Sequence, residues 1–147
     1  MLGRLRRRAG AASKCRSPSS KLGGALTSSA AAQATCLLFV YGSLKRGRAN
    51  HHELRAAQYL KGARTAPRFG LRMIDGYPAL VPGLRAIAGE LYRIPVAALL
   101  ALDQFEGAGY DRQEIELEHR ERALAYLARE PDAGAPYPGD DWPLPQD

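Results

Sequence analysis

The segment Leu37–Gly47, which reads Leu-Leu-Phe-Val-Tyr-Gly-Ser-Leu-Lys-Arg-Gly, constrains the fold more than any other part of the chain. An unbroken apolar run predicts a buried strand over Leu37–Tyr41, and the glycine after it predicts a turn. A strand that ends at Gly42-Ser43 exposes backbone N–H groups and a hydroxyl at one point. This arrangement predicts a cradle for a small anionic or carbonyl group. The alternative is a turn without a ligand, which is the commoner role of glycine.

Charge is distributed unevenly along the 147-residue chain. The formal net charge is +6, but residues 1–36 contain seven Lys and Arg side chains and no acidic residue. The remaining residues contain 14 basic and 15 acidic side chains, for a net charge of −1. Because the positive charge belongs to the N-terminal segment, we expect no nucleic-acid partner for the folded part.

Residues 1–36 are predicted to form a disordered basic extension, because they are rich in Ala, Ser, Gly and Arg and show no apolar period. Three interpretations stay open: an organellar transit peptide, a nucleic-acid-binding arm, and an upstream translated extension without function. Two cysteines are too few for a disulfide framework, and no apolar run approaches 18 residues. We therefore expect a cytoplasmic protein, or an organellar one if the extension is a transit peptide, with no membrane span.

The rest of the chain predicts about six strands and two short helices. The helices are expected at 51–58, where Asn50 and Glu53 resemble a capping box, and from Pro95 to about Phe105. Turns are expected at 75–78 and 81–83, and 131–147 is predicted to be a Pro-rich loop or tail. The fold class is therefore α+β: one domain over 37–130, a small, mostly antiparallel β-barrel with short flanking helices. The strands are expected at 37–41, 59–66, 68–74, 87–94, 110–117 and 123–128.

Glu106 is the candidate catalytic residue. It ends the second helix, where the helix dipole disfavours a negative charge, and it follows the apolar residues Leu102 and Phe105. A carboxyl group beside apolar side chains has a raised pKa and can act as a general acid and base near neutral pH. The alternative is a solvated surface glutamate. Asp103 is the competing carboxylate, for which a structural role with nearby backbone donors is expected.

The sequence contains no motif that predicts a metal-binding or nucleotide-binding site. His51 and His52 are adjacent, so on a helix their side chains point about 100° apart and cannot bind one metal together. No Cys or His lies at zinc-ligand spacing from them, and a capping or packing role is expected instead. No P-loop or dinucleotide motif is present, and no nucleophile elbow surrounds Ser43. We expect neither metal nor organic cofactor, and we expect the Ser43 hydroxyl to bind substrate.

Taken in order, several segments over residues 37–128 resemble the gamma-glutamylcyclotransferase-like (AIG2-like) superfamily, closest in motifs to gamma-glutamylamine cyclotransferase and small bacterial members. The segments are Tyr41-Gly42-Ser43-Leu44, Lys45-Arg46-Gly47 with Asn50-His51, Tyr77-Pro78-Ala79 with Val81-Pro82-Gly83, Gly89-Glu90-Leu91-Tyr92, and Leu102-Asp103-x-Phe105-Glu106 with Tyr110-x-Arg112.

This resemblance implies a barrel in which the 41–44 loop lines a pocket. It also implies a reaction on a small gamma-glutamyl substrate, whose α-amine attacks its own γ-carbonyl to release 5-oxoproline and an amine or amino acid. Glu106 matches the family's catalytic glutamate, and Tyr41, Gly42, Ser43, Leu44 and Tyr110 are the expected substrate-binding residues. Arg112 is expected to pair with a nearby acid.

Two other functions compete with this one. A non-catalytic small-molecule binding protein would keep the same pocket, and an interaction role would depend on the basic extension. The identity of the leaving group also stays open between ammonia, an alkyl amine, an ε-lysyl group and an amino acid.

Overall fold

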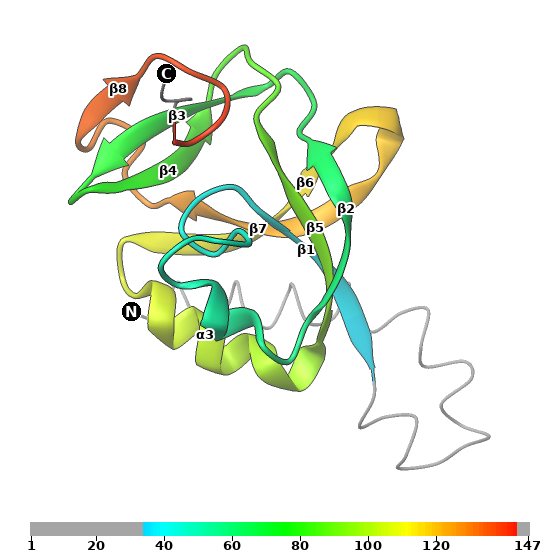
Figure 1. Cartoon of the computed structure of the whole chain (residues 1–147). Helices are drawn as coiled ribbons and strands as arrows, with labels where there is room; N and C mark the ends of the chain where they lie inside the picture. The colour runs from blue at the N-terminus through cyan, green and yellow to red at the C-terminus, as the bar shows by residue number, and fades with distance from the viewer. Residues whose placement is uncertain (1–33, 144–147) are drawn as a thin grey trace.

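The structure, a computed structural model, describes residues 34–143 (Figure 1). Most of the predicted basic extension and the last four residues therefore lie outside the described part. Thr35 and Cys36, which we assigned to the extension, belong to the first strand. The strands are β1 (Thr35–Val40), β2 (Gln58–Arg64), β3 (Phe69–Ile74), β4 (Tyr77–Pro82), β5 (Ala88–Pro95), β6 (Tyr110–Glu116), β7 (Arg122–Ala128) and β8 (Ala135–Tyr137). The helical elements are η1 (His51–Leu54), η2 (Val96–Ala98), α3 (Leu99–Glu106) and η3 (Glu118–Arg120).

The strands form one curled sheet in the order β2-β5-β1-β7-β4-β3-β8, and β6 pairs with β7 in addition. Most neighbouring strands are antiparallel, whereas β1 and β4 each run parallel to β7. Figure 1 shows the sheet curling over itself, with α3 lying along its lower side. The predicted fold class, a small and mostly antiparallel barrel-like sheet with short helices, is confirmed.

The first strand contributes to two separate apolar clusters. Leu38 and Val40 pack with Leu99 and Leu102 of α3, whereas Phe39 joins the cluster on the opposite face of the sheet. Successive side chains of a strand point to opposite faces, so a strand with both faces buried needs an unbroken apolar run. This is the physical reason for the apolar sequence that precedes Tyr41.

β7 pairs with one strand along its whole length and with two others at single positions. β6 pairs with β7 along its whole length, while β1 meets β7 at Leu38↔Leu124 and β4 meets it at Leu80↔Leu127. β1 ends at Val40, and the side chain of the next residue, Tyr41, links β7 to β4. The Tyr41 hydroxyl donates to the Tyr126 carbonyl oxygen at 2.5 Å and accepts from the Leu80 N–H at 2.9 Å.

The turn expected at 75–78 is confirmed only for Asp75-Gly76, and the turn expected at 81–83 is wrong for Val81 and Pro82. Both differences arise because Tyr77–Pro82 forms β4, which pairs with β3 from Ile74↔Tyr77 to Phe69↔Pro82. Proline cannot donate a ladder hydrogen bond, so Pro78 and Pro82 argued against a strand. The strand tolerates them because it pairs along its length with β3 alone and reaches β7 at one position.

The first helix is also shorter than expected. Only His51–Leu54 is helical, as one 3₁₀ turn, and Asn50 makes no side-chain capping hydrogen bond. The predicted capping box is therefore wrong. The amide of Asn50 donates instead to the hydroxyl of Ser43 at 2.9 Å, so tertiary contact has replaced the local cap.

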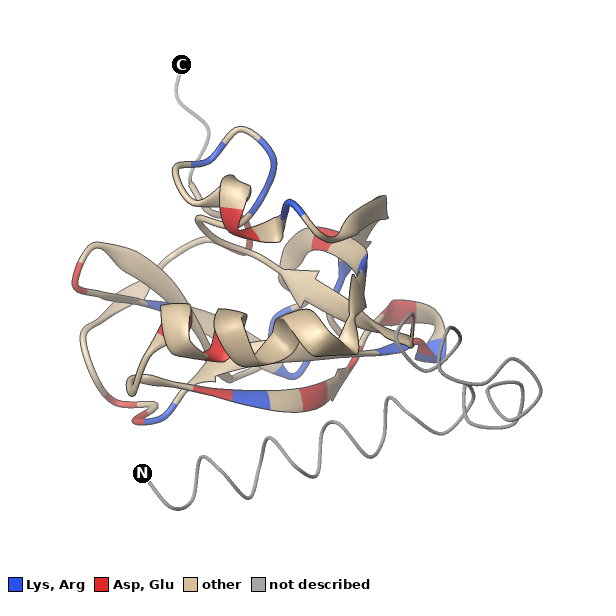
Figure 2. Ribbon diagram, turned by 90° about the horizontal axis from the view of Figure 1, so that it is seen from below, with Lys and Arg blue, Asp and Glu red and all other residues tan. Residues whose placement is uncertain are grey.

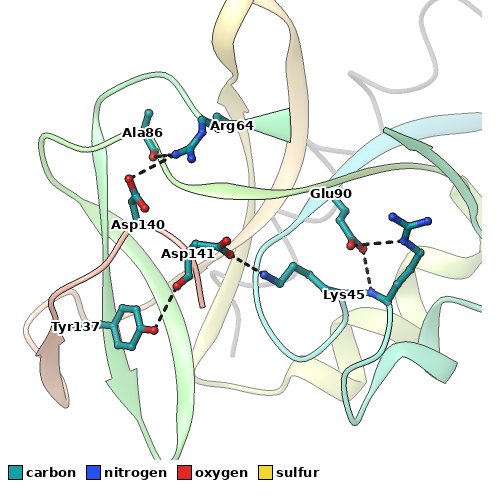
Figure 3. Close-up of polar contacts among 8 residues, drawn as sticks. Lys45, Arg64, Ala86, Glu90, Tyr137, Asp140 and Asp141 are labelled. Atoms are coloured by element: carbon teal, nitrogen blue, oxygen red, sulfur yellow. Dashed lines mark hydrogen bonds and ion pairs between the residues drawn. The ribbon is translucent and has the colours of Figure 1, made fainter. Parts of the chain in front are cut away.

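The segment predicted as a Pro-rich loop contains a strand and packs on the sheet. β8 pairs with β3, and Trp142 contacts the apolar cluster of Phe39. Figure 3 shows Asp141 accepting from the ammonium of Lys45 at 2.9 Å and Asp140 beside Arg64. These contacts could not be predicted from local sequence, because each partner is more than 70 residues away.

Figure 2 shows the acidic and basic positions scattered over the described ribbon, with neither sign gathered on one side. This distribution agrees with the small net charge of the residues after 36. Within the part of the chain that the structure describes, no helix has the length and apolar character needed to cross a membrane.

We predict that Tyr41→Phe lowers the free energy of unfolding by about 2–4 kcal/mol, because a buried N–H and a buried C=O each lose a partner. Urea unfolding measures the change. Tyr77→Phe is the matched control, since Tyr77 lies on β4 and its hydroxyl makes no hydrogen bond with a described residue. Equal stability of the two variants would contradict a bridging role for the Tyr41 hydroxyl.

Candidate active site

A cavity of about 310 Å³ lies where β1 ends, where β4 begins and where α3 ends. It brings together all six residues predicted for the site: Tyr41, Gly42, Ser43, Leu44, Glu106 and Tyr110. Their roles in binding and catalysis stay predictions. The remaining lining residues are Phe39, Val40, Asn50, Tyr77, Pro78, Phe105 and Tyr126.

The loop after β1 presents three consecutive backbone N–H groups. Within residues 34–143, the N–H groups of Gly42, Ser43 and Leu44 donate to no other group of the protein. A Cβ atom at Gly42 would lie 2.8 Å from the Cγ of Pro78, so only glycine lets the loop approach β4 this closely. Successive unpaired amides in a turn can bind an anion or a carbonyl oxygen.

Asn50, which lines the cavity, and His51, which does not, both hold this loop through hydrogen bonds. The Asn50 amide donates to the Ser43 hydroxyl, which leaves the proton of that hydroxyl for another acceptor. The Nδ1 atom of His51 lies 3.0 Å from the Leu44 carbonyl oxygen and must carry a hydrogen, because the carbonyl can only accept. His51 therefore holds the loop through this hydrogen bond, a structural role that goes with the capping or packing role expected for His51 and His52.

Glu106 occupies the last position of α3, which ends because Gly107 adopts a positive φ of 81°. The Glu106 carboxylate makes no hydrogen bond or ion pair with any residue of the described part. Burial, together with the smaller effect of the nearby Asp103 charge, raises the pKa of Glu106 from its usual 4.5 to about 7. A carboxyl group with this pKa can both accept and donate a proton near neutral pH.

Asp103 lies one turn earlier on α3 and has a different environment. Its carboxylate is 3.2 Å from the guanidinium of Arg112 and accepts from the Tyr126 hydroxyl at 2.7 Å. The structural role expected for Asp103 and the ion pair expected for Arg112 are both confirmed. The partners of Asp103 include these side chains rather than only the backbone donors that we expected.

The segment between Glu106 and Tyr110 is fixed by backbone hydrogen bonds. The Gly107 N–H donates to the Asp103 carbonyl oxygen at 3.0 Å, and the Gly109 carbonyl oxygen accepts from Arg129 at 2.9 Å. The Tyr110 hydroxyl donates to the Pro78 carbonyl oxygen at 3.2 Å, and burial raises the pKa of that hydroxyl to about 12. These contacts hold the end of α3 against β4 and so keep Glu106 at the cavity.

Sequence reasoning missed Tyr77, Pro78, Phe105 and Asn50 as lining residues of the cavity. Tyr77 and Pro78 were assigned to a turn, and Asn50 was assigned to a helix cap. The only local signal for Phe105 was an aromatic side chain directly before the candidate carboxylate. Among the described residues, there is no group of three or more His, Cys, Asp or Glu side chains that could hold a metal ion.

The cavity thus brings the unpaired amides together with a carboxyl group that has no hydrogen-bond or ion-pair partner among the described residues, an arrangement that can accommodate a small molecule. The family model described as "Gamma-glutamyl cyclotransferase, AIG2-like" matches residues 38–144. The chain therefore belongs to this family, as its sequence motifs predicted.

Individual relatives agree with this assignment. The gamma-glutamylcyclotransferase family protein YtfP of Escherichia coli is 40% identical over 81 residues, which are 54% of this chain and 71% of that protein. Gamma-glutamylaminecyclotransferase C of Danio rerio is 38% identical over 93 residues, 55% of this chain and 61% of that protein. The solution structure of E. coli YtfP has a TM-score of 0.57 and 34% identity, covering 74% of this chain and 96% of YtfP.

We predict that Glu106→Gln stabilises the protein above pH 7. The folded chain binds the Glu106 proton more tightly than the unfolded chain does, so wild-type stability falls as pH rises from the usual carboxyl pKa to about 7. The Glu106→Gln variant has no carboxyl group at this position, so its stability does not fall in this way. Unfolding in urea is expected to show similar stabilities near pH 4 and a gain of about 1–3 kcal/mol for the variant near pH 8. A pH-independent difference would contradict the raised pKa.

Proposed function

We propose that this chain catalyses the release of 5-oxoproline from a gamma-glutamyl compound. The observation that carries the proposal is the partnerless Glu106 carboxyl in one cavity with the three unpaired amides of Gly42, Ser43 and Leu44. A substrate held by the amides would bring its reacting amine to the carboxylate. Membership of the family supports the same reaction class.

In the proposed reaction, the α-ammonium group of the substrate first gives a proton to the Glu106 carboxylate. The freed amine then attacks the γ-carbonyl carbon and forms the C–N bond of a five-membered ring. The amide bond to the leaving group breaks, and its nitrogen takes the proton from Glu106. The ring nitrogen then gives its second proton to the Glu106 carboxylate, which passes it to the released amine, so the amine leaves as an ammonium ion. The products are 5-oxoproline and an amine, and no atom enters from a third reactant. One carboxyl group thus serves as base and then as acid.

The nucleophile and the electrophile belong to one molecule, so the enzyme's main task is to fold the substrate for ring closure. Well-oriented intramolecular reactions reach effective molarities of about 10⁵–10⁸ M. The N–H groups of residues 42–44 would hold the α-carboxylate or the developing oxyanion, as preorganised donors do. Tyr41 would contact substrate only through its ring, because its hydroxyl already bridges Leu80 and Tyr126.

We predict that Glu106→Gln lowers the rate of 5-oxoproline release by about 10² or more, the scale of a lost general base. Wild-type kcat/KM should rise as pH increases through about 7, because only the ionised carboxylate accepts the proton. The measurement is 5-oxoproline release from gamma-glutamyl amines, gamma-glutamyl dipeptides and glutathione between pH 5 and pH 9. Glu130→Gln, at an exposed position, is the matched control.

A wild-type protein that binds these compounds without turnover would contradict the proposal. That result, with undiminished binding by Glu106→Gln, would favour a non-catalytic binding protein that uses the same cavity.

We also predict that Asn50→Asp raises KM about 5–10-fold with little change in kcat, since one hydrogen bond contributes about 1 kcal/mol. The aspartate carboxylate would accept the Ser43 hydroxyl proton and withdraw it from the substrate. Ser43→Ala should have a similar effect, and the double variant should add nothing further. Additive effects in this steady-state comparison would show that the two side chains act separately.

A further inference from the structure

Two carboxylates bind the two basic residues that follow the loop of residues 42–44. Glu90, on β5, accepts from the backbone N–H of Arg46 at 2.9 Å, and its other oxygen lies 3.6 Å from the Nε atom of that side chain. Asp141, in the segment after β8, accepts from the ammonium of Lys45 at 2.9 Å. Figure 3 shows both carboxylates beside this stretch of chain. Neither of them lines the cavity, so any effect that they have on the site acts through the loop.

Backbone hydrogen bonds define where the unpaired N–H groups of residues 42–44 end. The Lys45 N–H donates to the Gly42 carbonyl oxygen at 3.1 Å and closes a turn. The next N–H group, that of Arg46, donates out of the loop to Glu90. The peptide groups on both sides of Lys45 are therefore fixed, one by the turn and the other by a side chain from another strand.

Glu90 is a restrained acceptor. Its side chain is only 15% exposed, and the Tyr92 hydroxyl donates to the same oxygen, Oε1, at 3.0 Å. The guanidinium of Arg46 lies 3.6 Å from the centre of the Tyr59 ring, which restrains that side chain as well. Hydrogen bonds to a charged acceptor are stronger than neutral ones, so removal of the Glu90 carboxylate takes a strong restraint from the loop.

Asp141 belongs to a segment that connects distant parts of the sheet. The carbonyl oxygen of its neighbour Asp140 accepts from the Ala88 N–H at 2.7 Å, at the start of β5. β8, shortly before this segment, pairs with β3 at the other end of the strand order, and its Tyr137 hydroxyl donates to the Asp141 carbonyl oxygen at 3.2 Å. The ammonium of Lys45, whose side chain is only 12% exposed, is thus bound by a carboxylate that is itself held from two sides.

We propose that Glu90 and Asp141 are positioning residues of the site, which hold Arg46 and Lys45 so that the three unpaired N–H groups keep one arrangement before substrate arrives. Preorganised donors bind an anion or a carbonyl oxygen without a further cost of ordering the loop. This inference rests on the proposed function. Without either carboxylate, the loop must be ordered in the bound state and in the transition state alike, so KM rises and kcat changes little.

Asp141→Asn and Asp140→Asn form a matched pair that tests the inference. The two side chains are neighbours, are 54% and 48% exposed, and each form one ion pair, that of Asp140 with Arg64 at 3.5 Å. We expect similar small losses of stability in urea for both variants. KM for 5-oxoproline release should rise about threefold for Asp141→Asn alone, the scale of one partly exposed ion pair. Asp140→Asn should leave KM unchanged.

Two variants of Glu90 test the other contact. Glu90→Ala should raise KM about tenfold, the scale of a lost hydrogen bond to a charged group. Glu90→Gln keeps an oxygen that can accept from the Arg46 N–H, so it should retain most of the wild-type affinity. The pH dependence of kcat/KM should be the same in both variants as in wild type, because Glu106 is untouched. Asp141→Asn is the deciding variant if Glu90→Ala does not fold.

Three results would overturn the inference and leave the proposed function intact. The first is an equal rise in KM for Asp140→Asn and Asp141→Asn, which would indicate general loosening of the segment. The second is an unchanged KM in both Asp141→Asn and Glu90→Ala. The third is a lower KM for Asp141→Asn, which would mean that the freed Lys45 ammonium attracts substrate more than the fixed loop does.

If the wild-type protein releases no 5-oxoproline from any gamma-glutamyl compound, the proposed function fails. Backbone order parameters of the N–H groups of residues 42–44, measured by NMR relaxation, then decide the inference. Lower values in Asp141→Asn and Glu90→Ala than in wild type and Asp140→Asn support it. Equal values in all four proteins refute it.

Discussion

The two hydrogen bonds of the Tyr41 hydroxyl are the interaction on which the rest of the structure depends. β7 carries two parallel neighbours, β1 and β4, on the same side, and no backbone joins them where β1 ends. The Tyr41 side chain makes that junction by linking the backbone of β7 to that of β4. The chain can therefore leave the sheet at Gly42 without opening the core, and the cavity forms at this point of departure.

Two carboxylates on one short helix have different chemistry because their surroundings differ. Asp103 is buried and bound by Arg112 and Tyr126, so its charge is balanced inside the domain. Glu106 is one turn further on, without an acceptor or donor partner in the described structure, and the Asp103 charge helps to raise its pKa. Separating the properties of two neighbouring acids in this way is a common route to a general acid and base at neutral pH.

The loop of residues 42–44, with its unpaired N–H groups, is held in part by side chains that do not line the cavity. Glu90 accepts from the Arg46 N–H at 2.9 Å, Asp141 binds Lys45, and His51 donates to the Leu44 carbonyl oxygen. Because the loop's carbonyl groups and side chains are fixed from outside, its N–H groups can stay unpaired. A rigid, unsatisfied donor set costs stability in the absence of ligand, and the contacts of β8 and the residues after it help to offset that cost.

The sequence by itself determined the elements whose signals are local. The apolar run before Tyr41, the helix that ends at Glu106 and the acidic character of that helix end were all readable, because strand burial and helix termination depend on neighbouring residues. Tertiary structure alone decided that Tyr77–Pro82 is a strand and that 135–137 pairs with β3. It also decided that the Asn50 side chain donates to the Ser43 hydroxyl and does not cap a helix. These outcomes depend on partners distant in sequence, whose hydrogen bonds and packing outweigh the local preferences of proline and asparagine.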